Sequence, residues 1–261
     1  MPGVLTLTTD FGTDDHFVGV MKGVILKIAP SAKLIDITHS VTPFSVTEGA
    51  FEIGEAYRWF PKKTVHLVVV DPGVGSARRP IVVEAGGQYF VGPDNGVFSM
   101  IYSRNLHSVR HISNKKYFLR NVSQTFHGRD IFAPVAAHLA RGVKPSLVGK
   151  RVDNYVRGDS GKPVRTGTRC WAGMILKVDR FGNMITNFHV EEFPDVLNRP
   201  FVLLAGIRTT DKLIHNFTEA SPTEPAVVVG SSGFLEVVVN QGSAAKLLGC
   251  ANGSPAELSI Y

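Results

Sequence analysis

The sequence predicts an α/β domain with a mainly parallel, doubly wound sheet over residues 1–153, followed by a smaller all-β, barrel-like domain over residues 171–261. Three observations support this fold class. Apolar runs of strand length alternate with segments of helical periodicity in the first part of the chain. A polar, Gly- and Pro-rich interval at 154–170 is typical of an interdomain linker. Short strand-like segments separated by turns follow that interval.

The composition excludes several classes of protein. The chain has 261 residues, of which 44% are apolar, so it is globular and long enough to bury a core. No apolar stretch reaches the ~18–20 residues of a membrane-spanning helix, and no basic segment precedes an apolar one at the N-terminus. Two cysteines make no disulfide framework, so we expect a cytoplasmic protein with reduced thiols. The net charge of +6 is spread along the chain, which indicates a solvated surface, and we expect neither a nucleic-acid nor a membrane partner.

The first segments alternate between strand and helix patterns. Residues 4–9 alternate in polarity, and residues 16–28 carry apolar side chains three and four positions apart. Asp14 or Asp15 is the expected N-terminal cap of that helix, and Pro30 ends it. The expected strands are residues 4–9, 34–37 and 67–70, and the expected helices are residues 16–28 and 47–59. This order predicts parallel strands with helical crossovers.

Ionisable or polar residues follow all three strands, at Asp10, at Thr38 and His39, and at Asp71. Because open α/β sheets bind ligands at the carboxyl ends of their strands, these residues predict a site at that edge. The Pro- and Gly-rich loop after Asp71 can fold back and bring Arg78 near it. The alternative is that Asp71 only caps this loop through backbone N–H groups.

The next segments add two further candidate loops. Residues 81–83 and 89–92 are expected strands, and residues 97–102 and 131–139 are expected helices. Asn95 lies in an Asp-Asn-Gly sequence, which also fits a plain turn. His127 lies just before a helix, between Phe126 and Gly128, which permit close approach of a ligand. A structural histidine is the alternative at this position.

The second domain has expected strands at residues 171–178, 200–205, 226–229 and 234–239. The loop at 179–187 combines an acid, an aromatic ring and two amides, which suits an Asn that reads a nucleobase edge while a Phe stacks on its face. An Asn-rich hairpin turn is the alternative. The small-residue loops at 229–236 and 240–244 fit either a wrapped carboxylate or adenine, or tight turns.

Common phosphate, hydrolase and metal motifs are missing from the sequence. It contains no G-x-G-x-x-G, P-loop, G-x-S-x-G, H-E-x-x-H or C-x-x-C pattern. The acids near strand ends favour a cationic ligand. One alternative is a metal-dependent phosphoesterase that uses Asp10, Asp14, Asp15, Asp94 and His127.

Taken together, the loops resemble one family. The motifs are T-T-D-F-G-T-D-D at 8–15, H-S-V-T-P-F at 39–44, D-P-G-V-G-S-A-R-R at 71–79, V-G-P-D-N-G at 91–96, F-H-G-R-D at 126–130, D-R-F-G-N-M-I-T-N at 179–187 and S-S-G-F-L-E at 231–236. In this order and spacing, they make the chain similar to the adenosine-forming S-adenosyl-L-methionine (SAM) hydrolases. These are also called SAM hydroxide adenosyltransferases and are related to the SAM-dependent fluorinase and chlorinase.

The resemblance implies a catalytic triad of Asp71, Arg78 and His127, with Arg79 as a neighbouring candidate for the arginine. The fluorinase has Tyr in place of Asp71 and Ser in place of Gly128, whereas the chlorinase shares the Gly. Asp71 together with His127 therefore favours water over halide as the nucleophile.

The resemblance also implies the substrate contacts. Asp10 would hold the ribose diol and Phe44 would line the ribose pocket. The methionyl end would meet Asp15 and Asp179, with Ser231, Ser232 and Glu236 nearby, and the adenine would lie among Phe181, Asn183 and Phe217. Asn95, Phe126 and Gly128 complete the expected substrate-binding set. The fluorinase has Trp in place of Ile185 and Arg in place of Ser232, which leaves the stacking and carboxylate contacts open.

The implied reaction is hydrolysis of SAM to adenosine and L-methionine, by in-line attack of an activated water on ribose C5′. No metal ion or organic cofactor is expected, because SAM itself is the substrate. Family members are homotrimers whose site lies between one subunit's first domain and its neighbour's second. The alternatives are a SAM-dependent chlorinase and a non-catalytic SAM- or adenosine-binding module.

Overall fold

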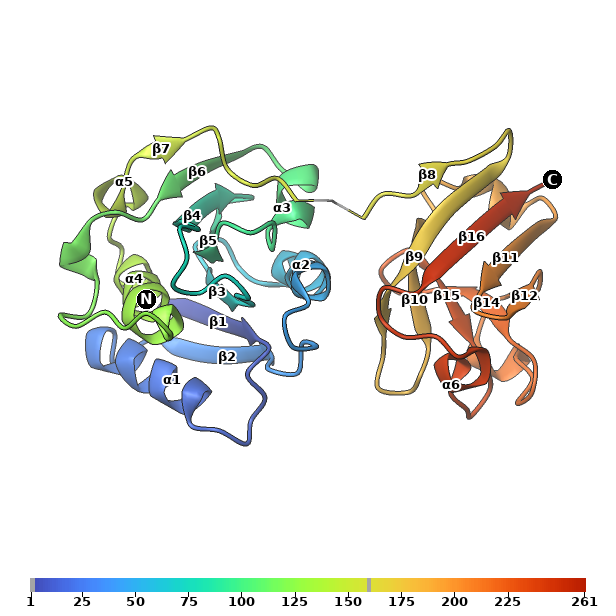
Figure 1. The fold of residues 1–261 in the computed structure, drawn as a ribbon, viewed down its shortest axis with the longest axis horizontal. Coiled ribbons are helices and arrows are strands. Elements are labelled where there is room, and N and C mark those ends of the chain that lie inside the picture. The colour runs from blue at the N-terminus through green and yellow to red at the C-terminus, as the bar shows by residue number, and fades with distance from the viewer. Residues whose placement is uncertain (1–2, 159–160) are drawn as a thin grey trace. The chain divides into compact units, whose positions relative to one another are not determined.

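The computed structural model describes residues 3–158 and 161–261, and the chain divides into two compact units, residues 1–160 and 161–261 (Figure 1). The N-terminal unit mixes helices and strands, and the C-terminal unit is rich in strands, as predicted. No helix in the described residues is long and apolar enough to span a membrane. The interval expected as a linker contains a short strand, since Val164–Arg165 (β8) pairs with β9 (Cys170–Val178) of the second unit.

The N-terminal unit contains one mixed sheet of strand order β2-β1-β3-β5-β4-β6-β7. Its strands are β1 (Val4–Thr9), β2 (Lys33–Thr38), β3 (Val65–Val69), β4 (Pro80–Ala85), β5 (Gln88–Pro93), β6 (His107–His111) and β7 (Arg151–Val152). Strands β2, β1, β3 and β5 run parallel, whereas β4, β6 and β7 pair antiparallel with their neighbours. The expected parallel sheet therefore holds for only part of the unit. Gly86 and Gly87, both at positive φ, join β4 to β5, and so tight a turn can connect only antiparallel strands.

Helices cover both faces of this sheet (Figure 1). They are α1 (Phe17–Ile28), α2 (Val46–Ala56), α3 (Ser99–Arg104), α4 (Ala133–Ala140) and α5 (Pro145–Val148), with short 3-10 turns at η1 (Tyr57–Trp59) and η2 (Lys115–Tyr117) and a π-helical turn at η3 (Gly128–Phe132). Alternate residues of β3 divide between two cores. Leu67 and Val69 pack with α1 and α4, whereas Val68 lies with residues of α2 and α3. An unbroken apolar run is what a strand covered on both faces requires.

Two helix starts differ from the sequence-based expectations. The residue that precedes α1 is His16, which makes no side-chain capping hydrogen bond, and α1 has no acid in its first turn. The expected capping by Asp14 or Asp15 is therefore wrong, because both acids lie in the exposed bends that come before the helix. The helix expected from residue 131 is preceded by η3, which starts at Gly128, and Pro134 lies in the first turn of α4, where a missing N–H costs little.

The C-terminal unit contains a sheet of order β12-β11-β16-β9-β10-β15-β14-β13, with β8 added beside β9. Its further elements are β10 (Met184–His189), β11 (Phe201–Ala205), β12 (Arg208–Thr210), β13 (Leu213–Ile214), β14 (Ala226–Val229), β15 (Phe234–Val238), β16 (Pro255–Ile260), α6 (Ala244–Leu248), η4 (Pro194–Leu197) and η5 (Phe217–Glu219). Leu203 on β11 and Val227 on β14 belong to the same core although they lie near opposite ends of the sheet. The sheet therefore curves around one core.

Strand β10 lies where the sequence predicted a loop or a hairpin turn. Its polar residues resemble those of a loop, but their side chains form hydrogen bonds inside the unit. The Thr186 hydroxyl donates to the Leu235 carbonyl at 2.7 Å, and Asn187 Oδ1 accepts the Met174 N–H at 2.9 Å. A buried strand can carry such residues because each polar atom has a partner.

Candidate functional site

The parallel pairing of β1, β2 and β3 brings three strand ends to one edge of the sheet, as the sequence predicted. Asp10 follows β1 and Asp71 follows β3. The loop after β2 lies against the loop after β1, because the Gly12 N–H donates to the His39 carbonyl at 2.7 Å and Thr9 Oγ1 lies 2.9 Å from His39 Nδ1. This edge therefore gathers the polar residues that follow β1, β2 and β3.

Arg78 contacts both other members of the expected triad. Its Nε donates to Asp71 Oδ1 at 2.9 Å and its Nη2 donates to Asp71 Oδ2, which makes a bidentate ion pair. Arg78 Nη2 also lies 2.8 Å from His127 Nδ1. The side chains of Asp71 and Arg78 are only 5% and 8% exposed. Three residues from two distant loops thus form one partly buried polar group.

A glycine allows these two loops to approach each other. Gly75 has φ +78°, and a Cβ at this position would lie 2.4 Å from the Gln124 carbonyl oxygen. A side chain at residue 75 would therefore push the Asp71–Arg78 loop away from the segment that carries His127.

The ring of His127 is held in one tautomer. Arginine can only donate, so His127 Nδ1 accepts and the neutral ring carries its proton on Nε2. Burial and the Arg78 guanidinium lower the pKa of His127 below its usual 6.5.

Asp130, which sequence reasoning did not place in the site, accepts the Ser123 N–H at 2.8 Å and pairs with Arg129, which orders the segment around His127. The F-H-G-R-D motif was the available signal for Asp130.

Two further polar groups belong to this edge of the sheet, one on Arg78 and one on Asp10. Arg78 Nη1 is buried and donates to no protein atom in the described residues. Asp10 accepts the Phe44 N–H at 2.9 Å, and burial raises the pKa of Asp10, with the Asp71 charge adding to the rise. Phe44 has φ +69° and is 72% exposed, an unfavourable backbone conformation for a residue with a side chain.

The neighbouring arginine has different partners. Arg79 donates to Asp94 Oδ2 through Nε at 3.0 Å and through Nη2 at 2.7 Å, and its Nη1 donates to Asn154 Oδ1 at 2.9 Å. Asp94 Oδ1 also accepts the Val156 N–H at 2.8 Å. Arg79 therefore holds a later segment of the chain, whereas Arg78 contacts Asp71 and His127.

Three of the other expected residues of this unit, Asn95, Phe126 and Gly128, are next in sequence to the triad segments or contact them. Asn95 donates from Nδ2 to the Val70 carbonyl at 2.9 Å, next to Asp71, and so orders the turn that follows β3. Phe126 is buried against Phe17, with ring centroids 5.2 Å apart. Gly128 is buried, with Met21 Sδ 3.2 Å from the place where a Cβ would stand. Asp15 is exposed in the bend before α1.

Five of the seven expected residues of the C-terminal unit line one cavity of about 670 Å³. Its lining includes Asp179, Phe181, Asn183, Phe217 and Glu236, together with residues 239–242. Sequence reasoning had not assigned residues 239–242 to the site, although it singled out the small-residue loop at 240–244. Ser231 and Ser232 lie in the turn between β14 and β15, outside the described lining of this cavity.

The two acids of this cavity have different surroundings. Asp179 Oδ1 accepts the N–H groups of Phe181 at 2.8 Å and Asn183 at 2.9 Å, and Asp179 Oδ2 accepts Asn183 Nδ2 at 2.9 Å. Burial and the Asp179 charge raise the pKa of Glu236 to about 7. The aromatic rings of Phe181 and Phe217 are 77% and 49% exposed.

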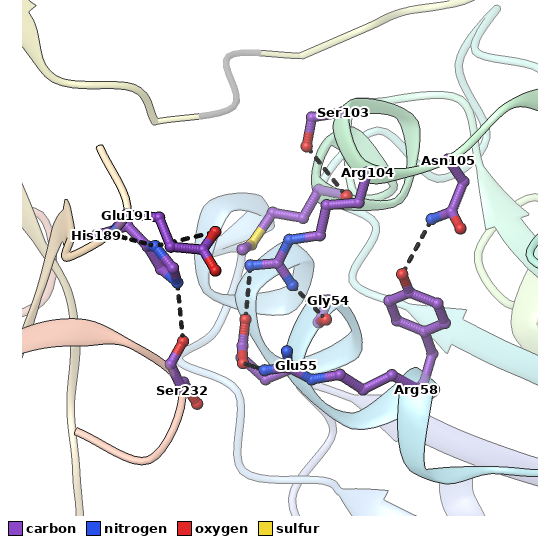
Figure 2. A network of polar contacts seen from close by, with 11 residues as sticks. Gly54, Glu55, Arg58, Ser103, Arg104, Asn105, His189, Glu191 and Ser232 are labelled. Atoms are coloured by element: carbon purple, nitrogen blue, oxygen red, sulfur yellow. Dashed lines mark hydrogen bonds and ion pairs between the residues drawn. The ribbon is translucent and has the colours of Figure 1, made fainter. Parts of the chain in front are cut away.

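A second cavity of about 600 Å³ lies beside α3, β6 and β7 and contains none of the expected residues. The contacts beside it join α2 to α3. Figure 2 shows Arg104, which donates to the Gly54 carbonyl at 2.7 Å and to Glu55 at 2.8 Å. Asn105 donates to the Tyr57 hydroxyl at 3.0 Å.

Within residues 3–158 and 161–261, no His, Cys, Asp and Glu side chains group in a way that could hold a metal ion, so the residues of the phosphoesterase alternative form no such group.

Comparisons with known proteins show the family of the chain. Family models described as the N-terminal and C-terminal domains of SAM hydroxide adenosyltransferase match residues 5–149 and 173–257. The chain is 38% identical to a protein of Salinispora tropica named (R)-S-adenosyl-L-methionine hydrolase, with 95% of each chain covered. A fluorinase of an Actinoplanes species is 28% identical, with 91% of each covered.

A solved structure of a Thermotoga maritima protein, described as an uncharacterized conserved protein, is 39% identical. It superposes with a TM-score of 0.89 over 98% of this chain and 99% of that one. The matched domains, the relatives and the fold together cover nearly the whole sequence. The chain therefore belongs to the SAM hydroxide adenosyltransferase family.

Proposed function

We propose that this protein hydrolyses SAM to adenosine and L-methionine. The observation that carries the proposal is the Asp71–Arg78–His127 group at the carboxyl edge of the parallel strands, in a chain of this family. A relative named (R)-S-adenosyl-L-methionine hydrolase, 38% identical over 95% of the chain, supports the same reaction.

The reaction is an in-line displacement at ribose C5′. A water oxygen forms the new bond to C5′ while the bond from C5′ to sulfur breaks, and its electron pair neutralises the sulfonium. The leaving group is a neutral thioether, so no general acid is needed. Hydroxide and a sulfonium cancel their charges in the transition state, and a site that excludes water favours this step.

The hydrogen bonds of the triad support a separate role for each residue. Arg78 is permanently protonated and His127 Nδ1 already accepts from it, so Asp71 is the acceptor for the water proton. Arg78 Nη1 and His127 Nε2–H are the donors that stabilise the developing hydroxide. Proton removal by a placed base contributes about 10²–10⁴-fold to such rates.

The substrate contacts are part of the same proposal. Asp10 and Phe44 hold the ribose, and the residues around the cavity of the C-terminal unit hold the adenine and methionyl groups. No metal or organic cofactor takes part, which activity unchanged by a chelator would test. The cytoplasmic location is also proposed, and the two unpaired cysteines, Cys170 and Cys250, support it.

We further propose a homotrimer in which the site forms between subunits. The expected contacts divide between two compact units, and aromatic rings are exposed on both, at Phe44 and Phe181. Mixing two inactive variants, Asp71→Asn and Asn183→Ala, tests this directly. Activity restored on mixing supports a shared site, whereas a monomer by light scattering and no restoration contradicts it.

Incubation with SAM in heavy-oxygen water tests the reaction itself. We expect the label in the 5′-hydroxyl of adenosine and none in methionine. Formation of 5′-chloro-5′-deoxyadenosine on adding chloride would identify a chlorinase instead. A bound nucleoside without turnover would identify a binding module.

A further inference from the structure

His39 is buried at the carboxyl edge of the first sheet and joins the loop after β2 to the end of β1. Its side chain is 5% exposed. Its Nδ1 atom lies 2.9 Å from Thr9 Oγ1, and its Nε2 atom lies 3.0 Å from Asp36 Oδ1. The ring is therefore contacted at both nitrogens, once by each of the two neighbouring strands.

An irregularity in strand β2 brings His39 to this position. Leu7 of β1 pairs with Asp36, but the next residue of β1 pairs with Thr38, so β2 contains one extra residue at this point. Side chains of a strand alternate between the two faces of the sheet, and an extra residue shifts that alternation by one. Asp36 and His39 therefore face the same side although they are three positions apart. Lys22 of α1, which packs on that side, reaches the same carboxylate at 2.6 Å.

The two loops that His39 joins also carry the expected ribose contacts. Asp10 directly follows Thr9, and Asp10 Oδ2 accepts the Phe44 N–H at 2.9 Å. The Gly12 N–H donates to the His39 carbonyl at 2.7 Å, so His39 contacts the end of β1 and the loop after it through side chain and backbone. The φ of +69° at Phe44 is unfavourable, and such a conformation persists only where neighbouring contacts fix the chain. The contacts of His39 help to fix these two loops.

We propose that His39 is a positioning residue that holds the Asp10 carboxylate in the geometry required to bind a ribose diol. The inference rests on the proposed function, in which Asp10 holds the ribose of SAM. In this role, His39 contacts no reacting atom. It acts through Thr9, whose backbone continues into Asp10, and so it determines how strongly the protein selects a nucleoside that has both ribose hydroxyl groups.

Two nucleosides that differ only in the diol measure this role. Adenosine has hydroxyl groups at C2′ and C3′, and 2′,3′-dideoxyadenosine has neither. Calorimetric titration of the full chain with each nucleoside gives the ratio of the two affinities, which we call the diol selectivity. Asp10→Asn sets the reference for a lost diol contact. It should reduce the diol selectivity about tenfold or more, because the hydrogen bonds to a charged acceptor are lost.

Variants of His39 should reproduce that loss without a change to the carboxylate itself. His39→Ala should weaken adenosine binding by a factor that approaches the loss in Asp10→Asn, with 2′,3′-dideoxyadenosine unchanged. In the Asp10→Asn background, the same replacement should not alter the diol selectivity further, because a positioning residue acts through the group that it positions. His39→Asn, whose amide can still bond to Thr9, should recover part of the diol selectivity.

Strand β1 provides a matched pair of variants that keep the shape of the side chain. Thr9→Val removes the hydroxyl that His39 contacts, so it should lower the diol selectivity as His39→Ala does. Thr6→Val is the control, because Thr6 Oγ1 lies 2.7 Å from Nδ1 of another buried histidine, His66. Thr6 lies three residues before Thr9 on the same strand, so its replacement should keep the parent's diol selectivity, whatever its effect on stability.

The outcomes separate this inference from the proposed reaction. Unchanged diol selectivity in His39→Ala and Thr9→Val overturns the role of His39, even if the parent hydrolyses SAM. An equal loss in Thr6→Val also overturns it, because the effect would then follow from a general loosening of the sheet. A parent that hydrolyses no SAM but loses its diol selectivity with His39 supports this inference and overturns the reaction. A parent without diol selectivity overturns the roles of Asp10 and His39 together. Unchanged binding of 2′,3′-dideoxyadenosine shows that each variant is folded.

Discussion

Asp71 in the N-terminal unit and Glu236 in the C-terminal unit have opposite surroundings. In the N-terminal unit, Asp71 is bound on both oxygens by Arg78, which also contacts His127. In the C-terminal unit, Glu236 lines a cavity with no described partner. A charge paired inside the protein keeps one geometry before any ligand arrives, which suits chemistry. A charge left unpaired gains its partner from the ligand, which suits recognition.

Replacing Asp71 tests the first half of this comparison and has the largest expected effect. Asp71→Asn keeps the shape of the side chain but removes the proton acceptor, so adenosine release should fall by about 10²–10⁴-fold. SAM binding should persist, because the cavity of the C-terminal unit is unchanged. Turnover and calorimetric binding measure the two effects. Asp153→Asn, at a side chain that is 91% exposed, is the matched control. Turnover at the parent rate would remove Asp71 from the mechanism.

The adjacent arginines provide the next test. Arg78→Lys removes the planar group that bridges Asp71 and His127, so kcat should fall by about tenfold or more. Arg79→Lys changes contacts to Asp94 and Asn154, so it should lower stability and largely keep kcat. Steady-state kinetics and thermal unfolding of both variants show which arginine supports catalysis and which supports stability. The reverse pattern would make Arg79 the catalytic arginine.

The pH profile tests the state of His127. Its pKa is held below 6.5 by burial and by Arg78, so the neutral ring predominates at and above neutral pH. Activity that depends on this neutral ring should therefore be constant there and decline as pH falls through the lowered pKa, where a proton on Nδ1 would displace the Arg78 hydrogen bond. Measured kcat/KM against pH checks this. An acidic limb that is unchanged in His127→Asn would assign the decline to another group.

The sequence predicted which side chains gather at the carboxyl edge of the N-terminal sheet, because these residues follow strand ends. Asp10 and Asp71 each follow an apolar strand, and the parallel order brings those ends together. The partner of Arg78 was also foreseeable from the Pro- and Gly-rich loop. Loop spacing favoured Arg78 over the neighbouring Arg79, and Arg78 is the arginine that contacts Asp71 and His127.

Other features depended on contacts that a sequence pattern does not contain. The antiparallel half of the first sheet follows from Gly86 and Gly87, whose positive φ values set the turn. Strand β10 was missed because the buried Thr186 and Asn187 resemble loop residues until their hydrogen-bond partners are known. The support of His127 by Asp130 likewise depends on the Ser123 N–H, seven residues earlier in the chain.

The smallest expected effect is at Asp94, whose charge is paired inside the protein but which is not part of the triad. Its side chain is 3% exposed and accepts hydrogen bonds from Arg79 and from the Val156 N–H. Asp94→Asn should lower the free energy of unfolding by about 1–3 kcal/mol, because the partly buried Arg79 loses its charged partner. Urea denaturation measures this, and kcat per folded molecule should stay near the parent value. A large fall in kcat with unchanged stability would show that the pairing of Asp94 with Arg79 also supports catalysis. Pairing inside the protein would then not distinguish the acids of the triad from acids that only stabilise the fold.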